Sequence, residues 1–286
     1  MVKTGIYFFL GMVLLFTSCQ DDSKKNEPTA LNTSVAHGNT DSSKTPMNDV
    51  ADFKFQMVIA NIPSPFEMIG ALTKSGVIFN NGLVNKPENE TNYLTSIKKA
   101  LNYGVYGVDM AYISANSENT QALKYFKVLH NLARSLGAAE SLDKIAGSRL
   151  ENHWDNKDTI TKIMDETYAA TDKYLRSGER QIIATEILTG CWVESQYLLL
   201  DALKEQTIND KNRELFKKLY EQKLHLNNLN SLLKEYSKEK DFMAIIEKIN
   251  NLNERFKSIT VVDDLNTEKI SSIAVSVKEI RDLIIK

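Results

Sequence analysis

The stretch that decides the fold is "QIIATEILTGCWVESQYLLL", residues 181–200. Its length and its lack of proline predict one long helix. Glu186 and Glu194 are its only charged residues, so the helix has almost no solvent face. Such a helix is either buried in a protein core or crosses a membrane. A charge at the bilayer centre costs about 3 kcal/mol or more. We therefore expect a helix buried in the protein core.

A second helix without a clear solvent face is expected over residues 92–113. Asn102, Tyr106 and Asp109 follow one another at intervals of four and three residues, which places them in one polar row on a helix otherwise built for burial. Beside its apolar stripe runs a flank of small residues that includes Gly104 and Gly107. Glycine costs about 1 kcal/mol in a helix interior relative to alanine. Two glycines there indicate that another helix packs very closely.

The rest of the chain predicts an all-α fold. All five prolines fall at or before Pro87, and apolar residues recur with helical spacing over most of the remaining sequence. We expect a multi-helix bundle of about eight or nine helices. The expected ranges are 64–76, 92–113, 118–136, 139–152, 157–177, 180–206, 211–236, 239–257 and 266–285.

The N-terminus has the features of a bacterial lipoprotein signal. "MVKTGIYFFLGMVLLFTSC" contains Lys3, an apolar run over residues 6–16 and a lipobox-like ending from Phe16 to Cys19. The run is shorter than the roughly 20 apolar residues that a membrane span needs. Residues 1–18 are therefore expected to be a signal peptide, and Cys19 is expected to carry the acyl chains that anchor the protein.

Residues 19–52 are expected to form a disordered tether, because they are rich in Ser, Thr, Asn, Asp and Lys and contain little that can be buried. Residues 53–286 then form the all-α globular domain. The anchored protein is expected in a bacterial cell envelope, on the outer membrane, at the cell surface or facing the periplasm.

Composition and motifs argue against several classes of function. The formal net charge is −2 and no basic-aromatic stripe is present, so nucleic acid is not an expected partner. The four histidines are scattered and none follows a Glu-x-x-His motif, so we expect no metal and no cofactor. The chain shows no glycine-rich phosphate loop and no pattern typical of a nucleophilic triad. We assign no catalytic residue and expect a non-enzymatic role.

The buried carboxylates remain the candidates for a site. Eight helical residues separate Glu186 from Glu194 by about 12 Å along the axis and about 80° around it, so they do not form a catalytic pair by themselves. Gly190 lies midway and leaves room for something to approach the backbone. Two interpretations stay open: a buried hydrogen-bond network between helices, or a pocket for a small polar ligand. The candidate residues are Asn102, Tyr106, Asp109, Glu186, Thr189, Gly190, Trp192 and Glu194.

Several motifs together resemble a family of lipoproteins from Bacteroidota. They are the lipobox, "IPSP" from Ile62, "NKPEN" from Asn85, "ALNYGVYGVDMAY" from Ala100 and "ILTGCWVE" from Ile187. The resemblance implies an all-helical domain in a Gram-negative envelope, and it implies no activity. Gln20, Asp21 and Asp22 are similar to signals that direct such lipoproteins to the cell surface.

The expected function is that of a membrane-anchored binding or interaction module. Its partners would be the membrane, through the N-terminal lipid, and either an envelope protein or a small polar ligand. The alternative is a ligand-binding or enzymatic pocket in the helical core around Asp109, Glu186 and Glu194.

Overall fold

The described part of the chain is entirely helical in its regular structure. A computed structural model describes Phe55, residues 65–138, single positions between 149 and 174, and residues 180–236 and 240–286. The all-α prediction is confirmed. The α-helices are α2 (Pro65–Lys74), α3 (Ser96–Ala115), α4 (Asn119–Ser135), α7 (Gln181–Leu203), α8 (Arg213–Tyr236), α9 (Lys240–Lys257) and α10 (Thr267–Ile285), and the 3-10 helices are η1 (Pro87–Asn92) and η2 (Val262–Asp264).

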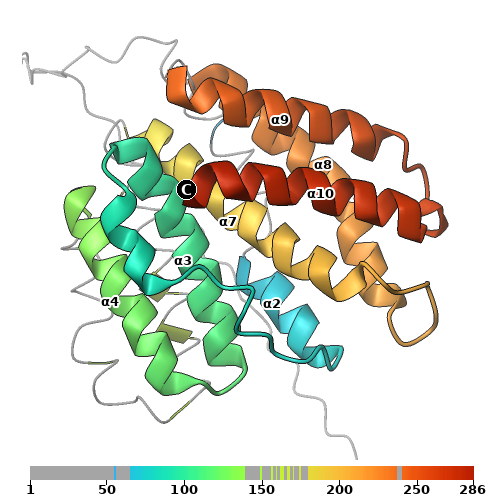
Figure 1. Ribbon diagram of the computed structural model, residues 1–286, viewed down its shortest axis with the longest axis horizontal. Coiled ribbons are helices and arrows are strands. Elements are labelled where there is room, and N and C mark those ends of the chain that lie inside the picture. The colour runs from blue at the N-terminus through green and yellow to red at the C-terminus, as the bar shows by residue number, and fades with distance from the viewer. Residues whose placement is uncertain are drawn as a thin grey trace, which may run out of the picture. The chain divides into compact units, whose positions relative to one another are not determined.

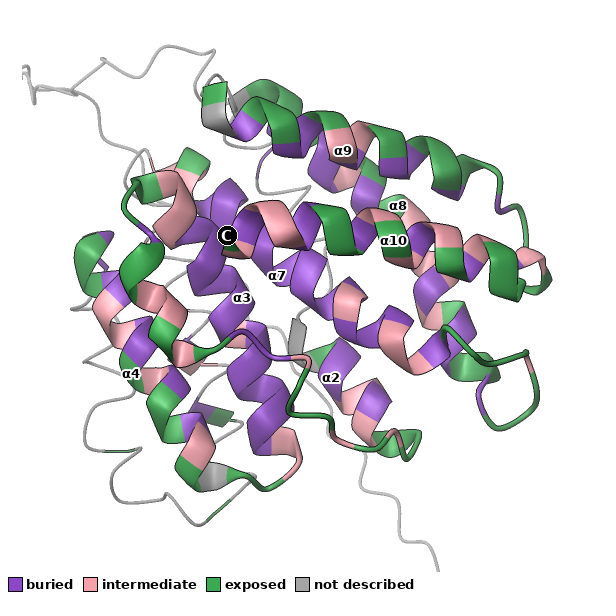
Figure 2. Ribbon diagram, viewed as in Figure 1, coloured by how far each residue is buried: buried purple, intermediate pink, exposed green. Residues whose placement is uncertain are grey.

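Helix α7 is the central element of the bundle. It packs against α3 on one side and against α8 and α10 on the other, while α4 lies outside α3 and α9 covers α8 and α10 (Figure 1). Every residue from Ala184 to Gln196 is buried, and most of α7 is coloured as buried in Figure 2. The expected burial of this helix is confirmed.

The crossing of α3 and α7 brings two backbones into direct contact. A β-carbon on Gly104 would overlap the carbonyl of Ile187, and a β-carbon on Gly190 would overlap the carbonyl of Leu101. Any larger side chain at either position would push the helices apart. The small-residue flank therefore packs closely at Gly104 as expected. Gly107 differs, because nothing lies within 4 Å of a β-carbon placed there.

The C-terminal helices bury the apolar stripes that their sequence predicts. On α10, Ile270, Ile273, Val277, Ile280 and Ile284 are all at most 2% exposed. On α9 the stripe from Phe242 to Phe256 is buried in the same way. The Asn266 side chain begins α10 by accepting a hydrogen bond from the Lys269 amide at 2.9 Å.

Two expectations differ from the structure in detail. Between the helices expected over 64–76 and 92–113 lies η1, in which proline occupies the first turn, where a helix tolerates its missing amide hydrogen. Helix α3 begins at Ser96, after Thr95, whose side chain accepts from the Lys98 amide, rather than at residue 92.

Several expectations lie outside the described residues. They are the signal peptide over 1–18, the acylated Cys19, the tether over 19–52 and most of the helices expected over 139–152 and 157–177.

Candidate functional site

The polar row of α3 is fully buried. Asn102, Tyr106 and Asp109 each have an exposed fraction of 0%. Asn102 Nδ2 donates to the carbonyl oxygen of Ile284 near the end of α10, at 2.9 Å. The hydroxyl of Tyr106 donates to the carbonyl oxygen of Lys86, at 2.8 Å. Asn102 therefore joins α3 to the end of α10, and Tyr106 joins α3 to the segment around Lys86.

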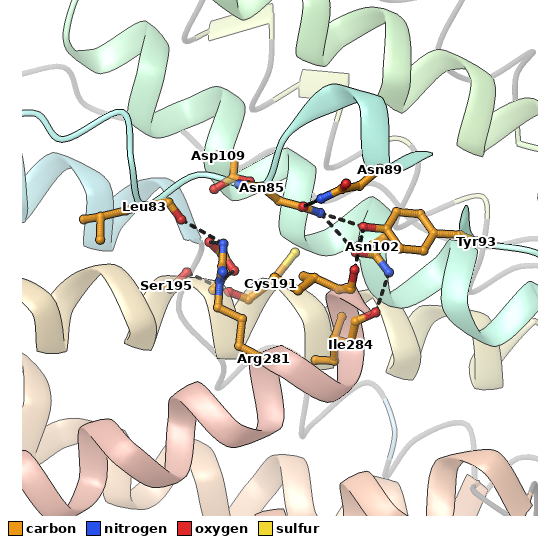
Figure 3. A network of polar contacts seen from close by, with 12 residues as sticks. Leu83, Asn85, Asn89, Tyr93, Asn102, Asp109, Cys191, Ser195, Arg281 and Ile284 are labelled. Carbon is orange, nitrogen blue, oxygen red and sulfur yellow. Dashed lines mark hydrogen bonds and ion pairs between the residues drawn. The ribbon is translucent and has the colours of Figure 1, made fainter. Parts of the chain in front are cut away.

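Residues 83–93, which we call the covering segment, lie over this row. The Asn85 amide donates to Asp109 Oδ2 at 2.9 Å, and Asn85 Nδ2 donates to the hydroxyl oxygen of Tyr93 at 2.8 Å. Asn89 Nδ2 donates in turn to Asn85 Oδ1 at 2.8 Å. Figure 3 shows Asn85 at the centre of these contacts, with Asn102 beneath it. The covering segment is held to α3 by the buried side chain of Asn85 and by its backbone amide.

An ion pair between α7 and α10 lies next to the row. Arg281 Nε donates to Glu194 Oε2 at 2.6 Å, and its Nη2 donates to Glu194 Oε1 at 2.8 Å. The side chains are 8% and 0% exposed. Arg281 Nη2 also donates to the carbonyl oxygen of Leu83 at 2.8 Å (Figure 3), and the guanidinium lies 4.2 Å from the ring centre of Tyr197. Arg281 therefore joins α7, α10 and the covering segment.

The electrostatics of the site follow from this burial. Burial raises the pKa of Asp109 well above its ordinary value of 3.8, and the charge of Glu194 raises it further, against Arg281. Burial alone lowers the pKa of Arg281, but the attraction of Glu194 reverses the shift and raises it overall. Burial also raises the pKa of Tyr93 and of Tyr106. At neutral pH the site therefore contains a charged arginine and neutral tyrosines.

The remaining candidates on α7 make other contacts. The hydroxyl of Thr189 donates to the Thr185 carbonyl of its own helix at 2.7 Å. Trp192 Nε1 donates to Gln222 Oε1 of α8 at 3.0 Å, so it joins a different pair of helices. Glu186 is 3% exposed, and its membership of the network stays a prediction.

The space beside Gly190 is occupied by the backbone of α3. The carbonyl group of Leu101 lies where a side chain of residue 190 would stand. The close approach inferred from Gly190 is therefore made by another helix. Neither Tyr106 nor Asp109 fills this space.

Sequence reasoning missed two essential residues of the site, Arg281 and Asn85. Arg281 follows Val277 by four residues and precedes Ile284 by three, so it falls within the apolar stripe of its helix. A charged residue inside such a stripe signals a buried partner. Asn85 lies between the helices expected over 64–76 and 92–113, and no periodic pattern marks it.

No protein-family model, curated protein or solved structure matches this chain. The likeness to Bacteroidota lipoproteins therefore stays a prediction. Among the described residues, no group of three or more His, Cys, Asp or Glu side chains is placed to hold a metal ion. Within the same part of the chain, no helix is long and apolar enough to cross a membrane.

Proposed function

We propose that the protein is a lipid-anchored, non-enzymatic binding or interaction module of a bacterial cell envelope. The non-enzymatic part of the proposal rests on the burial and the hydrogen bonds of the Glu194 carboxylate. It is 0% exposed, and both of its carboxylate oxygens accept hydrogen bonds from Arg281. A carboxylate occupied in this way joins helices. The polar groups of α3 and α7 then stabilise a rigid scaffold, and partners bind at its surface.

The anchoring part of the proposal rests on the N-terminal sequence. The apolar run over residues 6–16 ends in the lipobox-like residues before Cys19, and a polar stretch follows up to about residue 52. An acylated Cys19 on such a stretch holds the helical domain near a membrane without inserting it. The resemblance to Bacteroidota lipoproteins supports an outer-membrane, cell-surface or periplasm-facing location.

Replacing Cys19 tests the anchor. Cys19→Ala is expected to release the protein from the membrane fraction of a Gram-negative host and to abolish incorporation of labelled palmitate. The matched control is Cys191→Ala, which changes the buried thiol of α7 and leaves the lipobox intact. Membrane retention and palmitate labelling should persist in this control. Membrane retention of Cys19→Ala would contradict the anchor.

The alternative is a ligand or enzymatic pocket in the core around Asp109, Glu186 and Glu194. The observation that favours it is the buried Oδ1 of Asp109, which has no hydrogen-bond partner among the described residues. Glu186→Gln and Glu194→Gln separate the two functions. A structural network predicts a lower melting temperature in both variants, and no change of melting temperature when metals, sugars, polyamines or nucleotides are added to the wild-type protein. A pocket predicts a ligand-induced shift that the variants lose.

A further inference from the structure

Asp109 of α3 and Glu194 of α7 are neighbours in the core, and Arg281 of α10 pairs with Glu194. Asp109 Oδ2 accepts the Asn85 amide, while Asp109 Oδ1 is buried with no donor among the described residues. Both oxygens of Glu194 are occupied by Arg281. If both carboxyl groups were ionised, the site would carry two negative charges and one positive charge. Such an excess of buried charge is strongly unfavourable.

A single proton on Asp109 removes both the excess negative charge and the unpaired acceptor at Oδ1. It makes the site neutral, and it converts Asp109 Oδ1 from an acceptor without a donor into a hydroxyl that donates. The neighbour placed to accept is Glu194, whose side chain is within hydrogen-bonding reach of Asp109. A carboxylate oxygen has more than one lone pair, so Glu194 accepts this bond in addition to those from Arg281.

We infer that Asp109 and Glu194 form a proton-binding carboxyl pair, in which Asp109 is neutral and donates from Oδ1 to Glu194 while Arg281 balances the charge of Glu194. The proton is the ligand of this site, and the covering segment closes the site through the Asn85 amide and the Leu83 carbonyl. This inference does not depend on the proposed envelope function.

Burial and the charge of Glu194 raise the pKa of Asp109 and favour the neutral acid, while the charge of Arg281 opposes them. Glu194 approaches from α7 and Arg281 from α10, while the phenol groups come from Tyr106 on α3, Tyr125 on α4 and Tyr93 beside η1. Burial raises the pKa of each of these phenols, so they stay neutral and add no positive charge.

Because folding raises the pKa of Asp109, binding of this proton stabilises the folded chain. The pKa of Asp109 is higher in the folded chain than in the unfolded chain, where it is ordinary. The stability contributed by the proton is therefore complete below the ordinary pKa. It decreases as the pH rises from there through the raised pKa of the folded state.

The test compares the full-length wild-type protein in detergent with Asp109→Asn, measuring unfolding constants by denaturant titration between pH 4 and pH 9. The amide accepts from the Asn85 amide and donates to Glu194 without a titrating proton. The unfolding constant of the wild type, divided by that of the variant, is expected to rise about tenfold per pH unit within the window between the two pKa values. A ratio that does not change with pH would overturn the inference.

A control variant on α10 separates this effect from general titration. Glu279 is exposed and pairs with Lys248 on α9, so Glu279→Gln removes a carboxylate outside the site. Above pH 5 this variant should keep the pH dependence of the wild type. If Glu279→Gln removed that dependence as Asp109→Asn does, the assignment to Asp109 would be wrong.

A second measurement does not require any variant to fold. In the wild-type protein, infrared spectra at pH 7 should contain the carbonyl stretch of a protonated carboxylic acid, because the inferred carboxyl pair holds one proton. Absence of this band at pH 7 would overturn the inference. In a folded Asp109→Asn variant the band should disappear.

Discussion

Arg281 of α10 donates two hydrogen bonds to Glu194 of α7, at 2.6 and 2.8 Å, across 87 positions of sequence. The pair is buried, and Arg281 also holds the carbonyl of Leu83. Three segments that are distant in sequence therefore depend on one guanidinium.

Replacing this arginine should destabilise the bundle. Arg281→Met leaves Glu194 buried without its positive partner, and breaking a buried pair in this way costs about 3–5 kcal/mol in the free energy of unfolding. Urea denaturation followed by circular dichroism at pH 7 measures the loss. The matched control is Lys248→Met, which breaks the exposed pair with Glu279 and should cost less than about 1 kcal/mol. If both variants lost the same free energy of unfolding, the buried pair would contribute no more to stability than the exposed pair.

The glycine crossing gives a second prediction. Gly190→Ala places a methyl group against the Leu101 carbonyl, so α3 and α7 must separate and the free energy of unfolding should fall by about 1–3 kcal/mol or more. Gly107→Ala on α3 serves as the control, since its β-carbon meets nothing within 4 Å. This control should be neutral or stabilise by up to about 1 kcal/mol, because alanine favours the helix. If Gly190→Ala melted at a higher temperature than Gly107→Ala, the close contact between Gly190 and the Leu101 backbone would be wrong.

Asp264 should stabilise the turn before α10 in a pH-dependent manner. Its Oδ2 accepts from the Thr260 amide and hydroxyl and from the Val261 amide, and these bonds lower its pKa from 3.8 to about 2. Because the folded pKa is depressed, the stability it adds is present above pH 3.8 and is lost as the pH falls to about 2. Asp264→Ala should therefore melt at a lower temperature than the wild type at pH 6. The two melting temperatures should converge near pH 2, and a constant difference would contradict this assignment.

One buried acceptor on α8 serves two side chains of α7. Gln222 Oε1 accepts from Trp192 Nε1 and from Gln196 Nε2, each at 3.0 Å. Gln222→Leu leaves both buried donors unpaired, at a cost of about 1–3 kcal/mol for each. Urea unfolding followed by tryptophan fluorescence measures the change. Trp192→Phe should cost less in the Gln222→Leu background than in the wild type. Additive losses would show that the two side chains do not interact.

The burial of α3 and α7 and the polar row of α3 were predictable because helical periodicity is a local property. Asn102, Tyr106 and Asp109 share one face at the spacing that a helix imposes, whatever packs against them. The absence of charged residues between Glu186 and Glu194 likewise predicts that α7 is buried, whatever packs against it. These properties follow from residues within a few turns of one another.

The partners of the row were not predictable in the same way. Asn85 reaches Asp109 from an irregular segment, and Arg281 reaches Glu194 from the last helix of the chain. Gly104 and Gly107 look alike in sequence, yet only the former lies at the helix crossing. By itself the sequence determined which faces are buried and which polar groups need partners. Only the tertiary structure decided which partners they have, because contacts between segments depend on crossing angle, register and loop path.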